Sequence, residues 1–223
     1  MLPTEITPEL LLPYLVKFMI IFLVNPLHEF AHAYAAHKLG DDTAKNAGRL
    51  TIDPLTHVDP FGALFLLLFG YGWAKPVPVN PANFKHKNRD MLIVAIAGPL
   101  TNLLAAFLAT IAFQMCGGFQ KFNYVSDGSS QYYFFYMLNE FISINLVLFL
   151  FNMLPVPPLD GSRVLNYFLP PKAAMWYLKY SRIFYGLMFF LMMVGVLGIP
   201  IAYGCYYLHA GMKWLVQFLP VVI

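Results

Sequence analysis

Residues 10–39 read LLLPYLVKFMIIFLVNPLHEFAHAYAAHKL, an apolar stretch that carries the pattern HEFAH at residues 28–32. About 20 mostly apolar residues suffice for a helix to cross a bilayer, so this stretch predicts a membrane-spanning helix. The whole chain agrees, because 59% of its 223 residues are hydrophobic and only 11% are charged, against about 45–50% and about 25% in soluble domains. The formal charge of +3 is small, and we expect no nucleic-acid partner.

Four stretches of the sequence are long and apolar enough to span a bilayer. They cover residues 10–39, 91–115, 133–154 and 183–208. The sequence therefore predicts an all-α polytopic membrane protein with about four transmembrane helices, folded as a single membrane-embedded domain over residues 1–223. The tail, residues 209–223, mixes Lys213 and Trp214 with apolar residues and is predicted to lie at the membrane interface.

Basic residues alternate between the loops that join these stretches. The loop between the first and second and the loop between the third and fourth are rich in Lys and Arg, whereas the loop between the second and third contains only Lys121. Because cytoplasmic loops carry more Lys and Arg, we expect both termini to face outward and the two basic loops to be cytoplasmic. His28, His32 and Asp160 then lie near the cytoplasmic ends of their spans, on one side of the cell membrane.

The first basic loop differs from an ordinary linker. Residues 48–54 show a short strand-like alternation ended by proline, and residues 73–81 contain three prolines, which favour extended backbone. Between them, the apolar run at residues 61–69 is too short to span and is interpreted as a re-entrant or interfacial segment. We therefore expect a re-entrant, β-hairpin-like region over about residues 48–81, with proline confining its second strand to an edge.

The HEFAH pattern has the spacing of a metal site. His28 and His32 are one helical turn apart, so they lie on one face and can bind one ion. Glu29 is rotated by about 100° from His28 and would lie beside the metal, where the general base for an activated water belongs. Two imidazoles and a carboxylate are costly to bury in an apolar span without partners, which favours a metal site. The alternative is that these three side chains are buried and form ordinary hydrogen bonds without a metal.

A catalytic zinc ion usually has three protein ligands and one open position. Asp160 is the best candidate for the third ligand, because it follows the sequence PVPPL at residues 155–159, whose prolines prevent a regular helix. Irregular backbone at membrane depth persists only where it is buried in protein or faces water. The alternative is a proline-rich turn whose aspartate caps a helix. His37 lies on the opposite side of the first helix, whereas His57 lies in the loop and its role stays open.

Together these residues resemble the site-2 protease family of intramembrane zinc metalloproteases. The resemblance rests on HEFAH at residues 28–32 in the first span, GPLTN at residues 98–102 in the second, and NMLPVPPLDG at residues 152–161 after the third. The order and spacing of the three motifs are far more specific than HExxH alone. The chain shows no PDZ or CBS domain and is similar to a minimal form of the family.

This resemblance implies roles for individual residues. His28, His32 and Asp160 match the family's ligands to one catalytic zinc ion. Glu29 matches its catalytic glutamate, and Asn152 matches an asparagine thought to steady the substrate or the oxyanion. The implied reaction is peptide-bond hydrolysis in or next to a transmembrane segment of a protein or peptide substrate, within the lipid bilayer.

Some assignments stay open at this point. Asn102 fits the second-span motif, but its role is not defined. The loop at residues 48–81 is similar to the family's re-entrant β-hairpin, whose edge strand would receive an unwound substrate. Two alternative functions are a non-catalytic substrate-binding relative and a metal transporter that uses buried His and Asp. The intact Glu29 argues against the first, and the clustering of polar groups on one side of the membrane argues against the second.

Overall fold

The computed structural model describes residues 8–69, 72–126 and 128–222. Within these ranges the chain is helical apart from short connections, and its one β-bridge joins Val58 to Ala74. Three helices are long and apolar enough to cross a membrane, and a bent pair could form a fourth span. The predicted all-α, multi-pass class is therefore confirmed.

The first span is one long helical rod in three parts: α1 (Pro8–Met19), a π-helical turn η1 (Ile20–Val24) and α2 (Asn25–Lys38). The wide turn comes directly before Pro26, which lacks an N–H group and would press on the carbonyl of the preceding turn in a regular helix. A π-turn is a common way to absorb such a misfit, and the Asn25 N–H group there bonds to the Ile20 carbonyl. The helix therefore continues through the HEFAH residues without a break.

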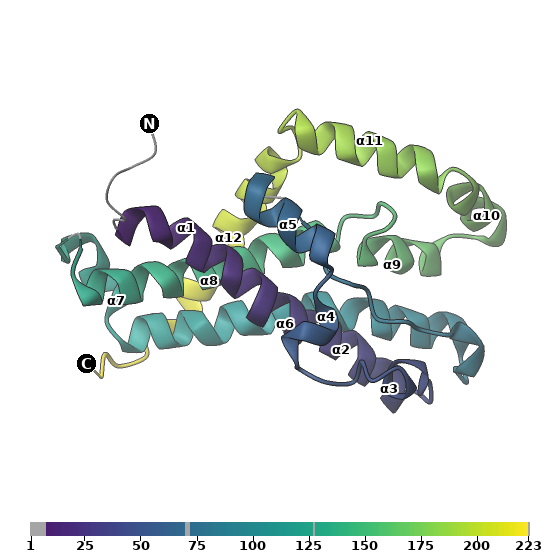
Figure 1. Ribbon diagram of the computed structural model, residues 1–223, viewed down its shortest axis with the longest axis horizontal. Coiled ribbons are helices and arrows are strands. Elements are labelled where there is room, and N and C mark those ends of the chain that lie inside the picture. The colour runs from purple at the N-terminus through teal and green to yellow at the C-terminus, as the bar shows by residue number, and fades with distance from the viewer. Residues whose placement is uncertain (1–7, 70–71, 127, 223) are drawn as a thin grey trace.

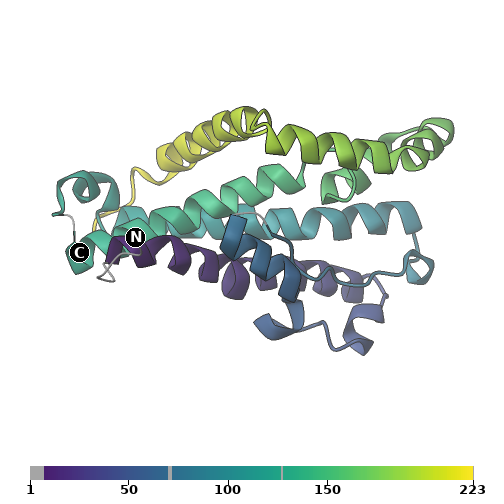
Figure 2. The ribbon, with the colours of Figure 1, turned by 45° about the horizontal axis from the view of Figure 1, so that its top comes forward.

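Two further spans pack against this rod. They are α6 (Lys87–Met115) and α8 (Ser130–Asn152), which lie close to the predicted bounds. α6 packs against both α2 and α8, so it occupies the centre of the bundle (Figures 1 and 2). The largest buried apolar cluster joins α6, α8 and the last helix through Ala106, Ala109, Phe113, Phe135, Ile142, Leu146 and Met212.

The predicted fourth span, residues 183–208, is wrong as a single helix. The structure has α11 (Ser181–Met193) and α12 (Gly198–Val216), which meet at a bend of 78°. Gly195 has a φ of +80°, and the bonds from Gly195 N to Met192 O and from Val196 N to Leu191 O close the helix end. A glycine in this conformation is a common helix terminator. Because α12 continues to Val216, most of the predicted interfacial tail is helical.

The hairpin-like sheet that the sequence suggested for residues 48–81 is not confirmed in the described part of this loop. Its described residues form α4 (Pro54–His57) and α5 (Pro60–Phe69), and strand pairing is limited to the bridge between Val58 and Ala74. The apolar run is thus a helix of 10 residues, about 15 Å long and too short to span a bilayer. The Lys17 ammonium donates to the Leu67 carbonyl at 2.6 Å, which holds the C-terminal end of α5 against α1.

Short helices complete the connections. They are α3 (Thr43–Asn46), η2 (Pro81–Asn83), α7 (Gly118–Lys121), η3 (Phe122–Tyr124), α9 (Asp160–Phe168) and α10 (Pro171–Lys179). The start of α1 and the C-terminal residues lie at the same end of the bundle (Figure 1). There the Val222 N–H group donates to the Met115 carbonyl at 2.8 Å.

Candidate metal centre

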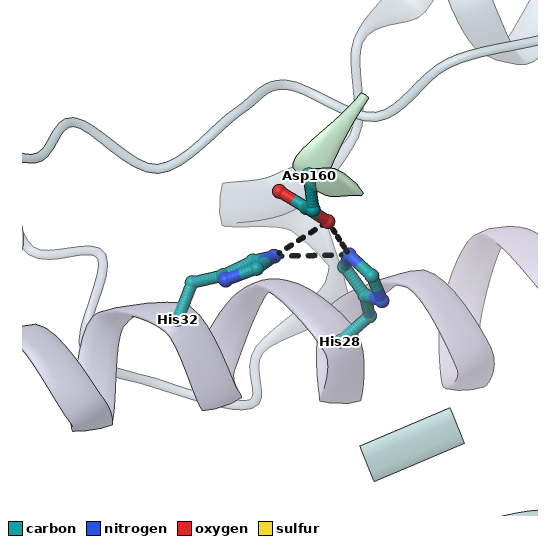
Figure 3. A group of neighbouring side chains, drawn as sticks. All are labelled: His28, His32 and Asp160. Atoms are coloured by element: carbon teal, nitrogen blue, oxygen red, sulfur yellow. Dashed lines mark hydrogen bonds and ion pairs between the residues drawn. The ribbon is translucent and has the colours of Figure 1, made fainter. Parts of the chain in front are cut away.

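Three side chains predicted as ligands converge on one point (Figure 3). The Nε2 atoms of His28 and His32 are 3.0 Å apart, and Asp160 Oδ2 lies 3.3 Å from the first and 3.2 Å from the second. His28 and His32 come from α2, whereas Asp160 is the first residue of α9. Among the described residues this is the one group of His, Cys, Asp and Glu close enough to share an ion.

Asp160 reaches the histidines because the chain between α8 and α9 is irregular. Residues 153–159 contain three prolines and form turns and bends, as the sequence suggested. The start of α9 then packs closely on this segment, since a Cβ atom at Gly161 would lie 2.3 Å from the Met153 carbonyl oxygen. Any larger residue would push α9 away. Gly161 therefore sets the position of its neighbour Asp160.

A second glycine brings α6 against the same point. A Cβ atom at Gly98 would lie 2.3 Å from His32 Nε2 and 2.6 Å from His28 Nε2. Only a residue without a side chain allows the α6 backbone to approach the imidazoles so closely. The motif at residues 98–102 is thus part of the wall of the site, although the sequence did not show how it contributes.

Hydrogen bonds from α6 orient both imidazole rings. His32 Nδ1 lies 2.7 Å from the Val94 carbonyl oxygen, and His28 Nδ1 lies 2.5 Å from Asn102 Oδ1. Both oxygens accept hydrogen bonds, so each histidine holds its ring proton on Nδ1. The two Nε2 atoms are therefore left with lone pairs that face each other and the Asp160 carboxylate.

This arrangement of acceptors fits a divalent cation. Two nitrogen lone pairs and a carboxylate oxygen at about 3 Å repel one another unless a positive charge lies between them. Zinc binds nitrogen and oxygen ligands at about 2.0–2.2 Å in a tetrahedron, which separates neighbouring ligand atoms by about 3.3–3.5 Å. The observed separations of 3.0, 3.2 and 3.3 Å are close to these values. The residues present therefore suit zinc.

Asp160 is partly buried, and a cation between its Oδ2 atom and the two Nε2 atoms would favour its ionised form. An ionised carboxylate is the form that binds a metal.

Glu29 lies next to this cluster, on the same helical turn, and contacts an extended segment of the first loop. We call residues 73–80 the strap. The Val77 N–H group of the strap donates to Glu29 Oε2 at 2.9 Å, so one oxygen of the carboxylate is fixed. The prolines on either side of Val77 keep the strap extended.

The strap is anchored at its C-terminal end by Asp41. One carboxylate oxygen accepts from Asn80 N at 2.7 Å, and the other accepts from Asn83 Nδ2 at 2.7 Å and from the Thr43 hydroxyl at 2.5 Å. Burial would raise the pKa of Asp41, but these hydrogen bonds outweigh it and lower the pKa. Asp41 is completely buried, so the ionised group depends on these partners.

The N-terminal end of the strap is anchored by Arg49 and His57, both buried. Arg49 Nη2 donates to the Lys75 carbonyl at 2.6 Å, and the Lys75 N–H group donates to the His57 carbonyl at 2.8 Å. The His57 ring nitrogen Nε2 donates to the Thr51 carbonyl at 2.8 Å. His57 therefore orders the loop and lies outside the ligand cluster, which answers the question that the sequence left open.

Other predicted residues have different positions. Asn152 is the last residue of α8, and in the described part of the chain it makes no hydrogen bond to the ligand cluster. His37 pairs with Asp42 and not with the cluster, in line with its predicted place on the other side of the helix. The sequence did not identify the Val94 carbonyl or Asn145, which donates to the Phe141 carbonyl. A buried amide in an apolar span was a usable signal for Asn145.

Comparisons with known proteins agree with this geometry. A family model described as "Peptidase family M50" matches residues 122–195, which include Asp160. The chain is 45% identical over 166 residues to "Putative zinc metalloprotease YwhC" of Bacillus subtilis, and the match covers 74% of this chain and 73% of that protein. It is 30% identical over 151 residues to "Putative zinc metalloprotease Rip2" of Mycobacterium tuberculosis, covering 66% of this chain and 54% of that protein. No solved structure matches it.

Proposed function

The chain belongs to peptidase family M50, the site-2 protease family of zinc metalloproteases, and we propose that it hydrolyses peptide bonds in or next to transmembrane segments of other proteins. The observation that carries this proposal is the convergence of His28, His32 and Asp160 beside Glu29. These three ligands would hold one zinc ion and leave a fourth position for water or substrate. When bound, zinc supplies Lewis acidity that makes a water molecule easier to deprotonate and a carbonyl easier to attack.

Glu29 has the geometry of the general base. Oε2 is held by the Val77 N–H group, and Oε1 is left to accept the proton from the attacking water. The same oxygen then passes this proton to the leaving amine. Asn152, at the end of α8, is proposed to donate to the substrate carbonyl as negative charge develops on its oxygen.

The substrate must be unwound before it is cut, because the amides of a helix are bonded within the helix. We propose that the unwound stretch lies along the strap and pairs with it as an added strand. The extended backbone of the strap and its two anchors, Asp41 and Arg49, support this role. Positions 76 and 78 are prolines, and the Lys75 and Val77 N–H groups already bond to His57 and Glu29, so the added strand would bond mainly to carbonyl groups of the strap.

The proposed orientation has the site on the cytoplasmic side of the cell membrane, with both termini outward. The alternation of Lys and Arg between the loops supports it. The partners in this proposal are therefore a transmembrane protein or peptide and the surrounding lipid.

The test compares membranes that contain the wild-type chain with membranes that contain Glu29→Gln. This variant keeps the shape of the side chain and removes the base, so zinc content should be unchanged. Cleavage should fall by about 10²–10⁴-fold or more, and uncut transmembrane fragments should accumulate in a proteomic comparison. Equal fragment patterns under all conditions would refute the proposal and favour a binding-only protein. Full activity of purified Glu29→Gln would refute the role of Glu29 as the base.

A further inference from the structure

A chain of buried amides links α8 to the first histidine of the candidate metal centre. Asn145 on α8 is 1% exposed and Asn102 on α6 is 2% exposed. Asn145 Nδ2 donates to the Phe141 carbonyl at 2.8 Å, Asn102 Nδ2 donates to Asn145 Oδ1 at 3.0 Å, and Asn102 Oδ1 lies 2.5 Å from His28 Nδ1. Amides are costly to bury in an apolar span, so a continuous chain of three bonds requires an explanation.

The direction of every bond in this chain follows from its far end. The Phe141 carbonyl can only accept, so the amino end of Asn145 must face it, and the Asn145 oxygen must face Asn102. That oxygen in turn requires the amino end of Asn102. The Asn102 oxygen is then the atom that faces His28, and the ring proton must be on Nδ1 of His28.

The two histidines differ in how this proton is held. The partner of His32 is the Val94 carbonyl, a backbone acceptor that cannot change its chemistry. The partner of His28 is an amide that offers a donor or an acceptor according to which way it is turned. Without a second residue to fix it, Asn102 could present its amino group to His28 and favour the tautomer with the proton on Nε2. That tautomer has no lone pair for the metal.

We propose that Asn145 is a positioning residue that, acting through Asn102, fixes the His28 tautomer so that Nε2 is free to bind a divalent metal. The inference deepens the proposed function, because it rests on the assignment of His28 as a zinc ligand. It gives Asn102, whose role the sequence left open, the task of transmitting the effect. Partners of this kind affect metal affinity by about 10–100-fold when they are removed.

A purely structural role predicts something different. Hydrogen bonds between asparagines of neighbouring helices also hold helices together in membranes. In that case removal of Asn145 would weaken the packing of α6 against α8, without changing the site of the proton on His28. Because Asn145 and Asn102 share one hydrogen bond, their effects on packing would also be non-additive, so the tautomer of His28 is the readout that separates the two roles.

The experiment uses the full-length chain in detergent micelles. The variants are Asn145→Leu, Asn102→Leu and the double variant, with Asn139→Leu as the matched control for the same change on the same helix. The first readout is ¹⁵N NMR of labelled histidines in metal-free protein, which reports the tautomer of His28. We expect the proton on Nδ1 in the wild type and in Asn139→Leu, and a substantial fraction on Nε2 in Asn145→Leu.

The second readout is the affinity for zinc, measured by competition with a chelator. Asn145→Leu should bind zinc about 10–100-fold more weakly, and it should have no further effect in the Asn102→Leu background. Asn145→Asp should restore both readouts, because a buried neutral carboxylic acid has the same donor and acceptor ends as the amide. If Asn145→Leu does not fold, Asn145→Ala provides the same two measurements.

Two results would overturn the inference. An unchanged His28 tautomer in Asn145→Leu would show that Asn145 does not act on the ring, and additive losses of zinc affinity would show that it does not act through Asn102. Failure of the proposed function is distinguishable from both. If the wild type bound no zinc, the ligand assignment would be refuted, while the tautomer in metal-free protein would still decide the role of Asn145.

Discussion

A single methyl group added at position 98 should displace the metal ligands and weaken metal binding. In Gly98→Ala the new Cβ atom would lie 2.3 Å from His32 Nε2, 2.6 Å from His28 Nε2 and 2.7 Å from His28 Cε1. Non-bonded heavy atoms prefer about 3.5–4.0 Å, so the rings or α6 must retreat by about 1 Å. Zinc sites tolerate changes of about 0.2 Å in their ligand distances. The displacement is about five times larger than this tolerance.

We therefore expect Gly98→Ala to bind zinc at least about 100-fold more weakly than the wild type, at the upper end of the losses seen when supporting groups are removed. The cost in folding free energy should be smaller, about 1–3 kcal/mol, because it comes from overpacking at one position. The assay is zinc content by mass spectrometry after purification, together with circular dichroism to confirm that helix content is retained.

The control for this prediction is Gly186→Ala in α11, where an added Cβ atom would meet nothing within 4 Å. This variant should keep its zinc, and it should gain up to about 1 kcal/mol from the better helix propensity of alanine. If Gly98→Ala bound one zinc ion with wild-type affinity, the metal could not lie between the two Nε2 atoms. The ligand assignment would then have to be abandoned.

Two further predictions follow from the contacts around the site. In Gly161→Ala the added Cβ atom would lie 2.3 Å from the Met153 carbonyl oxygen. The helix α9 should therefore shift, and zinc affinity should drop about 10–100-fold. Retention of full zinc affinity would show that Gly161 does not set the position of Asp160. Burial would raise the pKa of Asp41, but hydrogen bonds from Thr43, Asn80 and Asn83 lower it. The ionised group therefore stabilises the fold above its unfolded pKa of about 3.9, and this contribution is lost as the pH falls through the lower folded pKa. The difference in unfolding free energy between wild type and Asp41→Asn should therefore shrink as the pH falls below about 4, and a difference that stayed constant would contradict this role for Asp41.

The sequence predicted the helices that cross the membrane because their signal is local and strong. Length and hydropathy alone gave three spans with bounds within a few residues of those observed. The fourth predicted span is not one continuous helix, because α11 ends before Gly195, a residue with positive φ, and meets α12 at a bend of 78°. Hydropathy does not change across that bend, and a lone glycine in an apolar run is often tolerated within a helix.

The ligand cluster was predictable for a different reason. His28 and His32 are related by helical periodicity, and Asp160 follows a run of prolines that no helix accepts. The residues that support the cluster had no such signal. The Val94 carbonyl is a backbone atom, and the contact of Gly98 with the imidazoles depends on how two distant helices pack. Such contacts belong to the tertiary structure and leave no pattern in one sequence.

The hairpin predicted for the first loop is not confirmed, because proline indicates extended backbone without indicating a partner. The strap is extended as expected, but its Val77 and Asn80 N–H groups bond to the carboxylates of Glu29 and Asp41, whereas the Lys75 N–H group bonds to the His57 backbone carbonyl as in a hairpin. Side-chain acceptors thus replace part of the strand pairing. The sequence pointed to Glu29 and left the role of His57 open, but it gave no means of matching an acceptor to an individual N–H group.

These contacts together show what determines the geometry of the centre. In a membrane, apolar side chains pack equally well against lipid, so burial of apolar surface does not by itself bring helices close. Here two glycines allow the backbones to approach, and buried hydrogen bonds define the orientation of each ligand. Because His28 and Asp160 come from segments far apart in the chain, an ion bound between them would also hold α9 against α2. The energy of zinc binding should therefore contribute directly to the stability of the half of the bundle in which the ligands lie.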